Sequence, residues 1–356
     1  MNEFYKGKKV FITGHTGFKG TWLSRILLNY GAEITGYALE PPMSLNLFDM
    51  SGNSKHMKSI IGDIRDKELL DKEFKKANPE IVIHLAAQPI VRESYKNPCA
   101  TYEINVMGTV NLLECVRQSE SVGSVLNVTT DKVYENCEWP WGYRENDLLG
   151  GSDPYSNSKA CSEFVTSSYI KSFLSLKDIA VSTARAGNVI GGGDFAVDRI
   201  IPDCVRAALA SKSIIIRNPL SVRPYQHVLE PLYAYLLILK EQYKDKKFAG
   251  CYNVGPDDKD CILTGELVQI FCKKWEEITK NKLIYKIENQ DGPHEANYLK
   301  LDCSKIRTTL GWKPNWSVEM AVEKTVQWTD YYMNKRNISM IMDEQIDEFL
   351  NGGSYV

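Results

Sequence analysis

The stretch that decides the fold is KKVFITGHTGFKG, residues 8–20. Its apolar run predicts a short strand, and three glycines follow at intervals of three residues: Gly14, Gly17 and Gly20. Residues 18–32 then show the apolar periodicity of a helix. A strand, a glycine-rich turn and a helix in this order can cradle a dinucleotide pyrophosphate, because the helix N-terminus faces the phosphates.

Each of the three glycines has an expected role in that cradle. Gly14 permits a tight turn, Gly17 lets the backbone approach the phosphates, and Gly20 lets helix and strand pack closely. The first interval is one residue longer than in the G-x-G-x-x-G pattern, so the motif alone is moderately specific. The alternative is a glycine-rich turn without a ligand.

Outward from this motif, apolar runs alternate with helical patterns. The further predicted strands are residues 33–39, 59–66, 81–87, 124–130 and 179–191. The further predicted helices are residues 67–80, 100–118 and 153–173. Strands that alternate with helices predict βαβ units, so we expect an α/β fold with a Rossmann-type, doubly wound parallel sheet.

Later in the chain the pattern becomes polar and rich in turns, which predicts a smaller lobe interleaved with the first domain. We expect a dinucleotide-binding domain over residues 1–187, rejoined by about 224–255. The substrate lobe would comprise residues 188–223 and 256–335, followed by a tail over 336–356 with a terminal helix. Such a lobe would cover the carboxyl ends of the strands, where ligands bind in open α/β sheets.

Composition excludes several classes of function. The 356 residues are 43% hydrophobic and carry a net charge of −2, so no basic field invites nucleic acid or an anionic membrane. Nine scattered cysteines include no CxxC pair, which predicts neither a disulfide framework nor a metal site. The N-terminus lacks a signal-peptide pattern and no apolar run reaches the roughly 18–20 residues of a membrane span. We expect a soluble, cytoplasmic protein.

The choice between NAD and NADP depends on the end of the second strand. Residues 34–48, ITGYALEPPMSLNLF, contain no Lys or Arg that could receive a 2′-phosphate. The acidic residue expected for NAD is also missing, because its position falls near Ala38 and Glu40 lies further along. NAD is therefore favoured by the absence of a phosphate partner.

A second cluster follows the strand that ends in VTTDKVYEN, residues 128–136. Asp131 and Lys132 place an acid and a base where the strand stops. Tyr155 and Lys159 lie four residues apart, one helical turn on the same face. An ammonium beside a phenol stabilises the phenolate, so we expect Lys159 to lower the pKa of Tyr155 and make it a usable base. The alternative is an ordinary surface Tyr–Lys pair.

The motifs TGHTGFKG, GDIRD, HLAAQ, NVMGT, TTDK, YSNSK and RAGNVIGGGD together resemble the extended short-chain dehydrogenase/reductase family, from about residue 8 to about residue 335. Within it, the chain is most similar to nucleotide-sugar 4,6-dehydratases. The resemblance implies NAD, a homodimer formed through helices of the first domain, and CDP-glucose as substrate. A dTDP-, UDP- or GDP-sugar, or a nucleotide-sugar 4-epimerase activity, is the alternative. The implied cofactor-binding residues are Gly14, Gly17, Phe18, Lys19, Gly20, Asp63, Ile64, Leu85, Ala86, Ala87, Tyr155 and Lys159.

The resemblance also implies a mechanism. Tyr155 takes the 4-hydroxyl proton while a hydride passes from carbon 4 to NAD, and Thr130 hydrogen-bonds the 4-oxygen. Asp131 protonates the departing 6-hydroxyl and Lys132 removes the proton at carbon 5. Asn105 orders the lysine side of the relay.

Lys132 departs from the family pattern, because related dehydratases have Glu at this position. An ammonium is not a base, so Lys132 must lose its proton through burial or positive neighbours. The alternative is that Lys132 only orients water or the enolate oxygen. Family epimerases have no acid after the strand, so Asp131 is what favours a dehydratase.

The substrate's diphosphate suits arginine, which binds phosphate with two parallel hydrogen bonds. The expected substrate-binding residues are Asn188, Arg217, Arg223 and His294, the last two by their place in the family pattern. Arg185, deeper in its strand, is expected to be structural. Trp139 and Trp141 lie in an aromatic loop that could cover the sugar or pack at a subunit contact.

Overall fold

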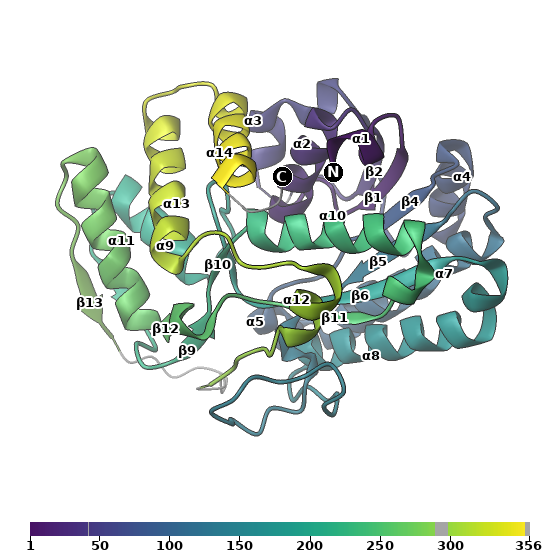
Figure 1. Cartoon of the computed structure of the whole chain (residues 1–356). Coiled ribbons are helices and arrows are strands. Elements are labelled where there is room, and N and C mark those ends of the chain that lie inside the picture. The colour runs from purple at the N-terminus through teal and green to yellow at the C-terminus, as the bar shows by residue number, and fades with distance from the viewer. Residues whose placement is uncertain (42, 289–297, 353–356) are drawn as a thin grey trace.

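A seven-stranded, wholly parallel sheet forms the centre of the molecule (Figure 1). The computed structural model describes residues 1–41, 43–288 and 298–352. The strand order is β11-β6-β5-β4-β1-β2-β3, which confirms the predicted doubly wound α/β fold. The strands are β1 (Lys9–Thr13), β2 (Glu33–Ala38), β3 (Lys58–Ile61), β4 (Ile81–His84), β5 (Ser124–Val128), β6 (Ala180–Ala186) and β11 (Cys251–Val254).

Helices bury both faces of this sheet. Along β1, Val10 and Ile12 face a core shared with α2 (Phe18–Asn29) and α10 (Leu229–Lys244), whereas Phe11 faces the opposite core. That second core is covered by α4 (Lys67–Ala77), α7 (Gly108–Gln118) and α8 (Pro154–Tyr169). The alternation follows from the two-residue period of a strand, and burial on both sides explains the nearly continuous apolar runs in the sequence.

The helix predicted over residues 100–118 is interrupted. It consists of α6 (Pro98–Tyr102), a π-helical turn over Glu103–Met107, and α7. Asn105 lies in the π-helical turn, where its Oδ1 accepts from Gln88 N at 2.9 Å and its Nδ2 donates to Ser158 Oγ at 2.9 Å. The wider turn therefore directs Asn105 to α8, and π-helical turns occur frequently at functional sites.

A smaller lobe stands beside the carboxyl ends of the strands and has its own core. Its two-stranded sheets pair β7 (Val189–Ile190) with β10 (Gln226–His227), β9 (Val222–Pro224) with β12 (Cys261–Leu263), and β8 (Ile214–Ile216) with β13 (Tyr285–Ile287). Its main helices are α9 (Ile200–Leu209), α11 (Thr264–Thr279) and α13 (Val318–Met333). Between the segments of this lobe the chain returns to the main sheet to form α10 and the edge strand β11.

Five shorter or peripheral helices complete the described chain: α1 (Asn2–Tyr5), α3 (Leu47–Ser51), α5 (Val91–Lys96), α12 (Ser304–Leu310) and α14 (Ile338–Gly352). The last contains the predicted terminal helix and is attached to α2, because Asp343 Oδ1 accepts from Arg25 Nε at 2.6 Å. Among residues 1–41, 43–288 and 298–352, no helix has the length and hydropathy that a membrane span requires.

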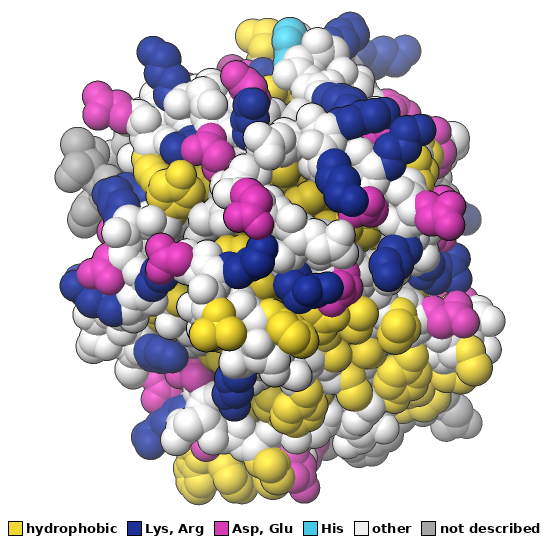
Figure 2. Space-filling model, turned by 90° about the vertical axis from the view of Figure 1, so that its right-hand side faces the viewer, with side chains coloured by type: hydrophobic (Ala, Val, Ile, Leu, Met, Phe, Trp, Pro, Cys, Tyr) yellow, Lys and Arg dark blue, Asp and Glu magenta, His cyan; other side chains and the backbone are white. Residues whose placement is uncertain are grey.

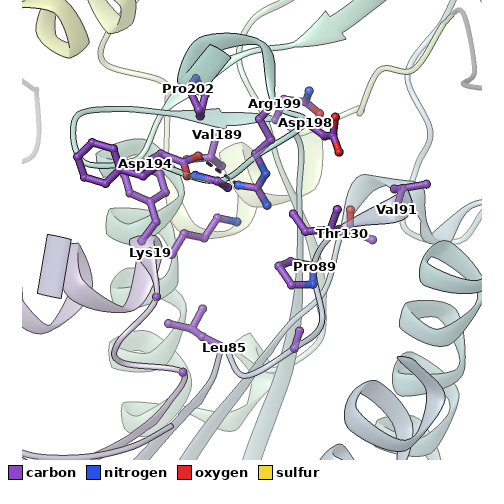
Figure 3. Close-up of a pocket in the computed structure, with 18 of the residues that line it drawn as sticks. Lys19, Leu85, Pro89, Val91, Thr130, Val189, Asp194, Asp198, Arg199 and Pro202 are labelled. Carbon is purple, nitrogen blue, oxygen red and sulfur yellow. Dashed lines mark hydrogen bonds and ion pairs between the residues drawn. The ribbon is translucent and has the colours of Figure 1, made fainter. Parts of the chain in front are cut away.

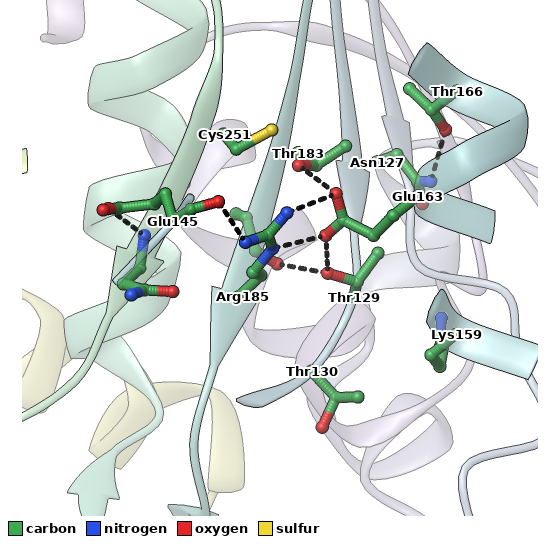
Figure 4. A network of polar contacts seen from close by, with 12 residues as sticks. Asn127, Thr129, Thr130, Glu145, Lys159, Glu163, Thr166, Thr183, Arg185 and Cys251 are labelled. Atoms are coloured by element: carbon green, nitrogen blue, oxygen red, sulfur yellow. Dashed lines mark hydrogen bonds and ion pairs between the residues drawn. The ribbon is translucent and has the colours of Figure 1, made fainter. Parts of the chain in front are cut away.

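A buried ion pair attaches α8 to the sheet (Figure 4). Arg185 Nε on β6 donates to Glu163 Oε1 on α8 at 2.9 Å, and both side chains are 3% exposed. Thr129 Oγ1 donates to the same carboxylate at 2.6 Å and Thr183 Oγ1 at 2.7 Å. Arg185 also donates to Tyr134 Oη at 2.8 Å. Both charged groups of the pair thus have further hydrogen-bond partners, which a buried ion pair requires to be stable.

Arg185→Met should therefore lower the free energy of unfolding by about 3–5 kcal/mol, because Glu163 would remain buried without its counter-charge. Urea denaturation measures the change. Lys177→Met is the matched control, since Lys177 pairs with the 90%-exposed Glu120 at 2.8 Å and such pairs contribute about 0–1 kcal/mol. Equal losses in the two variants would contradict the role assigned to the buried pair.

Candidate active site

A cavity of about 950 Å³ opens at the carboxyl ends of the strands, between the sheet and the smaller lobe (Figure 3). Its floor includes residues that follow β1 and β4, the two neighbouring strands from which the sheet order runs in opposite directions. Ligands of doubly wound sheets bind at this switch point. The volume falls at the upper end of the range typical of small-molecule sites.

The three glycines line the floor of the cavity, and the backbone explains two of them. Gly14 has φ +79°, and a Cβ there would lie 2.7 Å from Ala86 N. A Cβ at Gly20 would lie 2.1 Å from the Gly14 carbonyl oxygen, so this glycine lets α2 begin close to the turn. Gly17 is exposed, and a Cβ there would meet nothing closer than 3.4 Å. Its backbone faces the cavity, as a pyrophosphate cradle requires.

The other residues expected to bind a cofactor also line the cavity. They are Phe18, Lys19, Asp63, Ile64, Leu85, Ala86 and Ala87. The side chain of Lys19 projects into the cavity (Figure 3), where burial, together with the charges of Arg199 and Lys159, lowers its pKa to about 8. Arg65 bonds to Asp63 at 2.7 Å and holds the pKa of that carboxyl below its usual value.

Thr130 and Tyr155 are brought together on one wall of the cavity. Thr130 follows β5, and Tyr155 lies in the first turn of α8, which Asp153 caps by accepting from Ser156 N at 2.9 Å. Burial raises the pKa of Tyr155 to about 12, while its hydrogen bond with the Thr130 side chain and the charge of Arg199 act in the opposite direction. The phenol is therefore protonated at neutral pH.

Burial raises the pKa of Tyr155, and the effect expected of Lys159 on that pKa stays a prediction. Lys159 Nζ donates to the Val128 carbonyl oxygen at 3.1 Å, so its charge is directed to the end of β5. Burial lowers the pKa of Lys159 to about 8, and the nearby Glu163 opposes this shift. The helical spacing correctly placed both side chains on one face, but the Lys159 ammonium donates its hydrogen bond to the Val128 carbonyl oxygen.

Asp131 is a buried acid with cationic residues nearby. Its side chain is buried, Oδ1 accepts from Thr130 Oγ1 at 3.0 Å, and Oδ2 has no hydrogen-bond partner among the described residues. Burial raises the pKa of Asp131, while Lys132, Thr130, Arg223 and Lys19 oppose the rise. A carboxyl group in this state retains its proton more readily than a solvated one and can donate it.

The remaining predicted catalytic residues have different surroundings. Lys132 is half-buried and lines the same cavity as Asp131. Asn105 contacts Ser158, the residue before Lys159, and not the lysine itself. Asn105 therefore acts on the position of α8.

The substrate lobe contributes Asn188, Arg217 and Arg223 to the cavity wall. Arg217 pairs with Asp198 at 3.0 Å and with Asp203 at 3.2 Å. Arg223 Nη1 donates to Val222 O at 2.9 Å. His294 lies outside the described residues. The lining of the cavity does not include Trp139 or Trp141, whose ring centroids lie 5.4 Å apart in a tilted contact elsewhere in the described chain.

Sequence reasoning missed several charged residues of the site. Arg92, Asp194, Asp198, Arg199 and Asp203 all line the cavity. The available signal was the alternation of acidic and basic residues in GGGDFAVDRIIPD, residues 191–203, which was read only as a glycine-rich loop.

The comparisons with known proteins agree with this geometry. The family described as GDP-mannose 4,6 dehydratase matches residues 11–325. The chain therefore belongs to this family of nucleotide-sugar dehydratases within the extended short-chain dehydrogenases/reductases.

Two curated relatives and one solved structure show how similar the chain is to particular dehydratases. The chain is 44% identical over 355 residues to the CDP-glucose 4,6-dehydratase of Salmonella typhimurium, covering 98% of both chains. It is 27% identical over 343 residues to a probable dTDP-glucose 4,6-dehydratase of Sinorhizobium fredii, covering 90% of this chain and 92% of the relative. A solved dTDP-glucose 4,6-dehydratase of Bacillus anthracis, in complex with NAD, has a TM-score of 0.76 at 22% identity and covers 94% and 99% of the two chains.

Asp131→Asn should change how stability depends on pH. The folded chain holds the Asp131 proton above the ordinary pKa of 3.8, so this stabilisation is complete below that pH and is lost as pH rises through the folded-state pKa. The variant cannot titrate. Its free energy of unfolding should exceed that of the parent by a margin that grows with pH, by at most about 1.4 kcal/mol per pH unit.

Urea unfolding at pH 3, below the ordinary pKa of 3.8, and at pH 8 measures this margin. Asp178→Asn is the control, since the Asp178 side chain is 92% exposed. A margin for Asp131→Asn that is the same at both pH values would show that folding leaves its ionisation unchanged.

Proposed function

We propose that the protein is an NAD-dependent hydro-lyase that converts CDP-D-glucose to CDP-4-dehydro-6-deoxy-D-glucose, a step of deoxysugar biosynthesis. The observation that carries the proposal is the buried Asp131 beside the Thr130–Tyr155 pair in a cavity large enough for cofactor and sugar. The choice of a cytidine sugar rests on the 44% identity to the Salmonella typhimurium enzyme. The nine free thiols fit a reducing compartment such as the cytoplasm.

The residues present fit NAD. The exposed backbone at Gly17 and the start of α2 suit the pyrophosphate, and Asp63 and Ile64 line the cavity beside β2. Residues Ala38, Leu39 and Glu40 line the same end without a Lys or Arg for a 2′-phosphate. When bound, NAD accepts a hydride from carbon 4, returns it to carbon 6 and brings the positive charge of its nicotinamide ring.

The protein's first task is to remove the 4-hydroxyl proton. Thr130 and Tyr155 both line the cavity, and the Thr130 side chain favours the charged form of Tyr155, so a 4-oxygen bound between them would contact both. Positive charge near a phenol lowers its pKa. Tyr155 therefore becomes a base when a cationic group enters the cavity, and Arg199 already lies near it.

The second task is the elimination of water. Once carbon 4 is a ketone, the proton on carbon 5 becomes acidic and the 6-hydroxyl can leave. Asp131 gives its proton to that hydroxyl, which departs as water. Lys132, half-buried on the same wall, removes the carbon 5 proton or orients the group that does. A proton returns to carbon 5 when the hydride returns to carbon 6, which completes the 4-keto-6-deoxy product. The substrate's diphosphate is held by Arg217 and Arg223, with Asn188 beside them.

A nucleotide-sugar 4-epimerase is the second candidate, because a UDP-glucose 4-epimerase of Thermotoga maritima shares this fold with a TM-score of 0.76 at 21% identity, covering 92% and 99% of the two chains. Epimerisation at carbon 4 requires hydride transfer and the Tyr155 base alone. Epimerisation does not require a buried acid such as Asp131, whereas loss of water does, so this residue favours the dehydratase.

We further propose a homodimer formed through α7 and α8. Large apolar side chains are exposed on this face: Phe164 on α8 (57%), Met107 before α7 (51%) and Phe173 after α8 (43%). Figure 2 shows hydrophobic side chains gathered on the side of the molecule that carries these helices. A contiguous apolar patch of this kind marks an interaction surface.

Sedimentation velocity tests the dimer. The parent should sediment as a dimer and Phe164→Glu as a monomer, because a carboxylate cannot be buried in an apolar interface without a partner. Leu148→Glu is the control, since Leu148 is 70% exposed on the loop before α8. A dimeric Phe164→Glu variant would place the interface elsewhere.

The function is tested by incubating the enzyme and NAD with the CDP-, dTDP-, UDP- and GDP-linked glucoses. Mass spectrometry should detect loss of water from CDP-glucose. Tyr155→Phe should reduce the rate by about 10²–10⁴-fold, the usual contribution of a general base. Substrate binding should be nearly unchanged because the ring remains. A product isomeric with the substrate would establish the epimerase instead.

Asp131→Asn separates oxidation from elimination. Tyr155 and Thr130 are unaltered, so carbon 4 should still be oxidised, whereas an amide cannot protonate the leaving hydroxyl. The expected signature is reduced cofactor, detected by its near-ultraviolet absorbance, with little dehydrated product. Product formation at the parent rate would mean that Asp131 is structural.

A further inference from the structure

Three arginines of the cavity form ion pairs with aspartates of one segment, residues 194–203. Arg199 pairs with Asp194 at 3.3 Å, within that segment. Arg217, directly after β8, pairs with Asp198 at 3.0 Å and with Asp203 at 3.2 Å. Arg92, on α5, reaches the Asp198 carboxylate at 3.6 Å. Neither Arg92 nor Asp198 has a task in the chemistry derived above.

Asp198 connects two walls of the cavity. Arg92 belongs to a helix of the sheet-bearing part, immediately after Val91, whereas Arg217 directly follows a strand of the smaller lobe. Figure 3 shows Asp198 above Pro89 and Val91. Two guanidinium groups, one from each part of the chain, thus converge on a single carboxylate.

The hold on Asp198 is weak because the three side chains are 27–35% exposed, and ion pairs that remain partly solvated contribute little. A ligand that offered the two arginines more negative charge would therefore displace the carboxylate at low cost.

We propose that Arg92 and Arg217 form a two-sided clamp for the substrate's diphosphate, with Asp198 as the counter-ion that the diphosphate replaces. The clamp rests on the proposed nucleotide-sugar substrate and adds Arg92 to its binding residues. The two phosphate groups of a diphosphate can bond to one guanidinium group each. A single phosphate group reaches fewer of these donors, so the clamp selects for the diphosphate.

Isothermal titration of the NAD-saturated enzyme with CDP and with CMP tests the clamp, since saturation blocks the pyrophosphate site of the cofactor. Arg92→Met keeps the apolar stem and should weaken CDP binding about 10-fold, as expected for one charged hydrogen-bonding group. Asp198→Asn should tighten binding of both nucleotides. Arg144→Met is the control, because Arg144 pairs with Asp302 away from the cavity lining.

The outcomes separate the clamp from its alternatives. Unchanged CDP affinity in Arg92→Met, with NAD affinity and melting temperature as in the parent, would overturn it. Weaker CDP binding in Asp198→Asn would also overturn it, because Asp198 would then hold the ligand directly. UDP and dTDP distinguish a failure of the clamp from a wrong nucleotide base. The clamp contacts phosphate and not the base. Arg92→Met should therefore weaken the binding of every nucleoside diphosphate that the parent binds, and by the same factor. An effect confined to CDP would assign Arg92 to the base.

Discussion

The attachment of α8 to the carboxyl ends of β5 and β6 is the constraint on which the site depends. Glu163 bonds at once to Arg185, Thr129 and Thr183, so the helix is fixed relative to two strands. Tyr155 lies two helical turns before Glu163 on α8, and Thr129 precedes Thr130. The same carboxylate therefore sets the distance between the phenol and the threonine hydroxyl. A buried charge cluster can do this because its geometry is costly to change.

Burial then determines the protonation of the groups around the cavity. It raises the pKa of Tyr155 and Asp131 and lowers the pKa of Lys159 and Lys19, so each group is shifted toward its neutral form. For Asp131 this is useful directly, since an acid that keeps its proton can donate it. For Tyr155 it means that basicity depends on positive charge brought into the cavity. The low dielectric of the cavity thus favours the protonated form of Asp131, and it keeps Tyr155 protonated until positive charge enters the cavity.

The fold by itself does not determine the reaction. Epimerases and dehydratases share it, with TM-scores of 0.76 for solved examples of each, and both reactions need a site for a dinucleotide and a sugar. The difference lies in the residues after β5, where Asp131 and Lys132 follow Thr130. The residues at the end of one strand thus determine which reaction the fold supports, as is usual for folds that host several functions.

The sequence by itself determined the features that depend on short spacing. The strand, glycine turn and helix over residues 8–32, and the placement of Tyr155 and Lys159 on one helical face, follow from local periodicity. Only the tertiary structure decided which partners meet across the chain. The Val128 carbonyl binds Lys159, Glu163 meets Arg185, and Asp198 joins Arg92 to Arg217. These contacts join residues separated by tens of positions, and the chain brings them together only when its strands align and its second lobe closes over their ends.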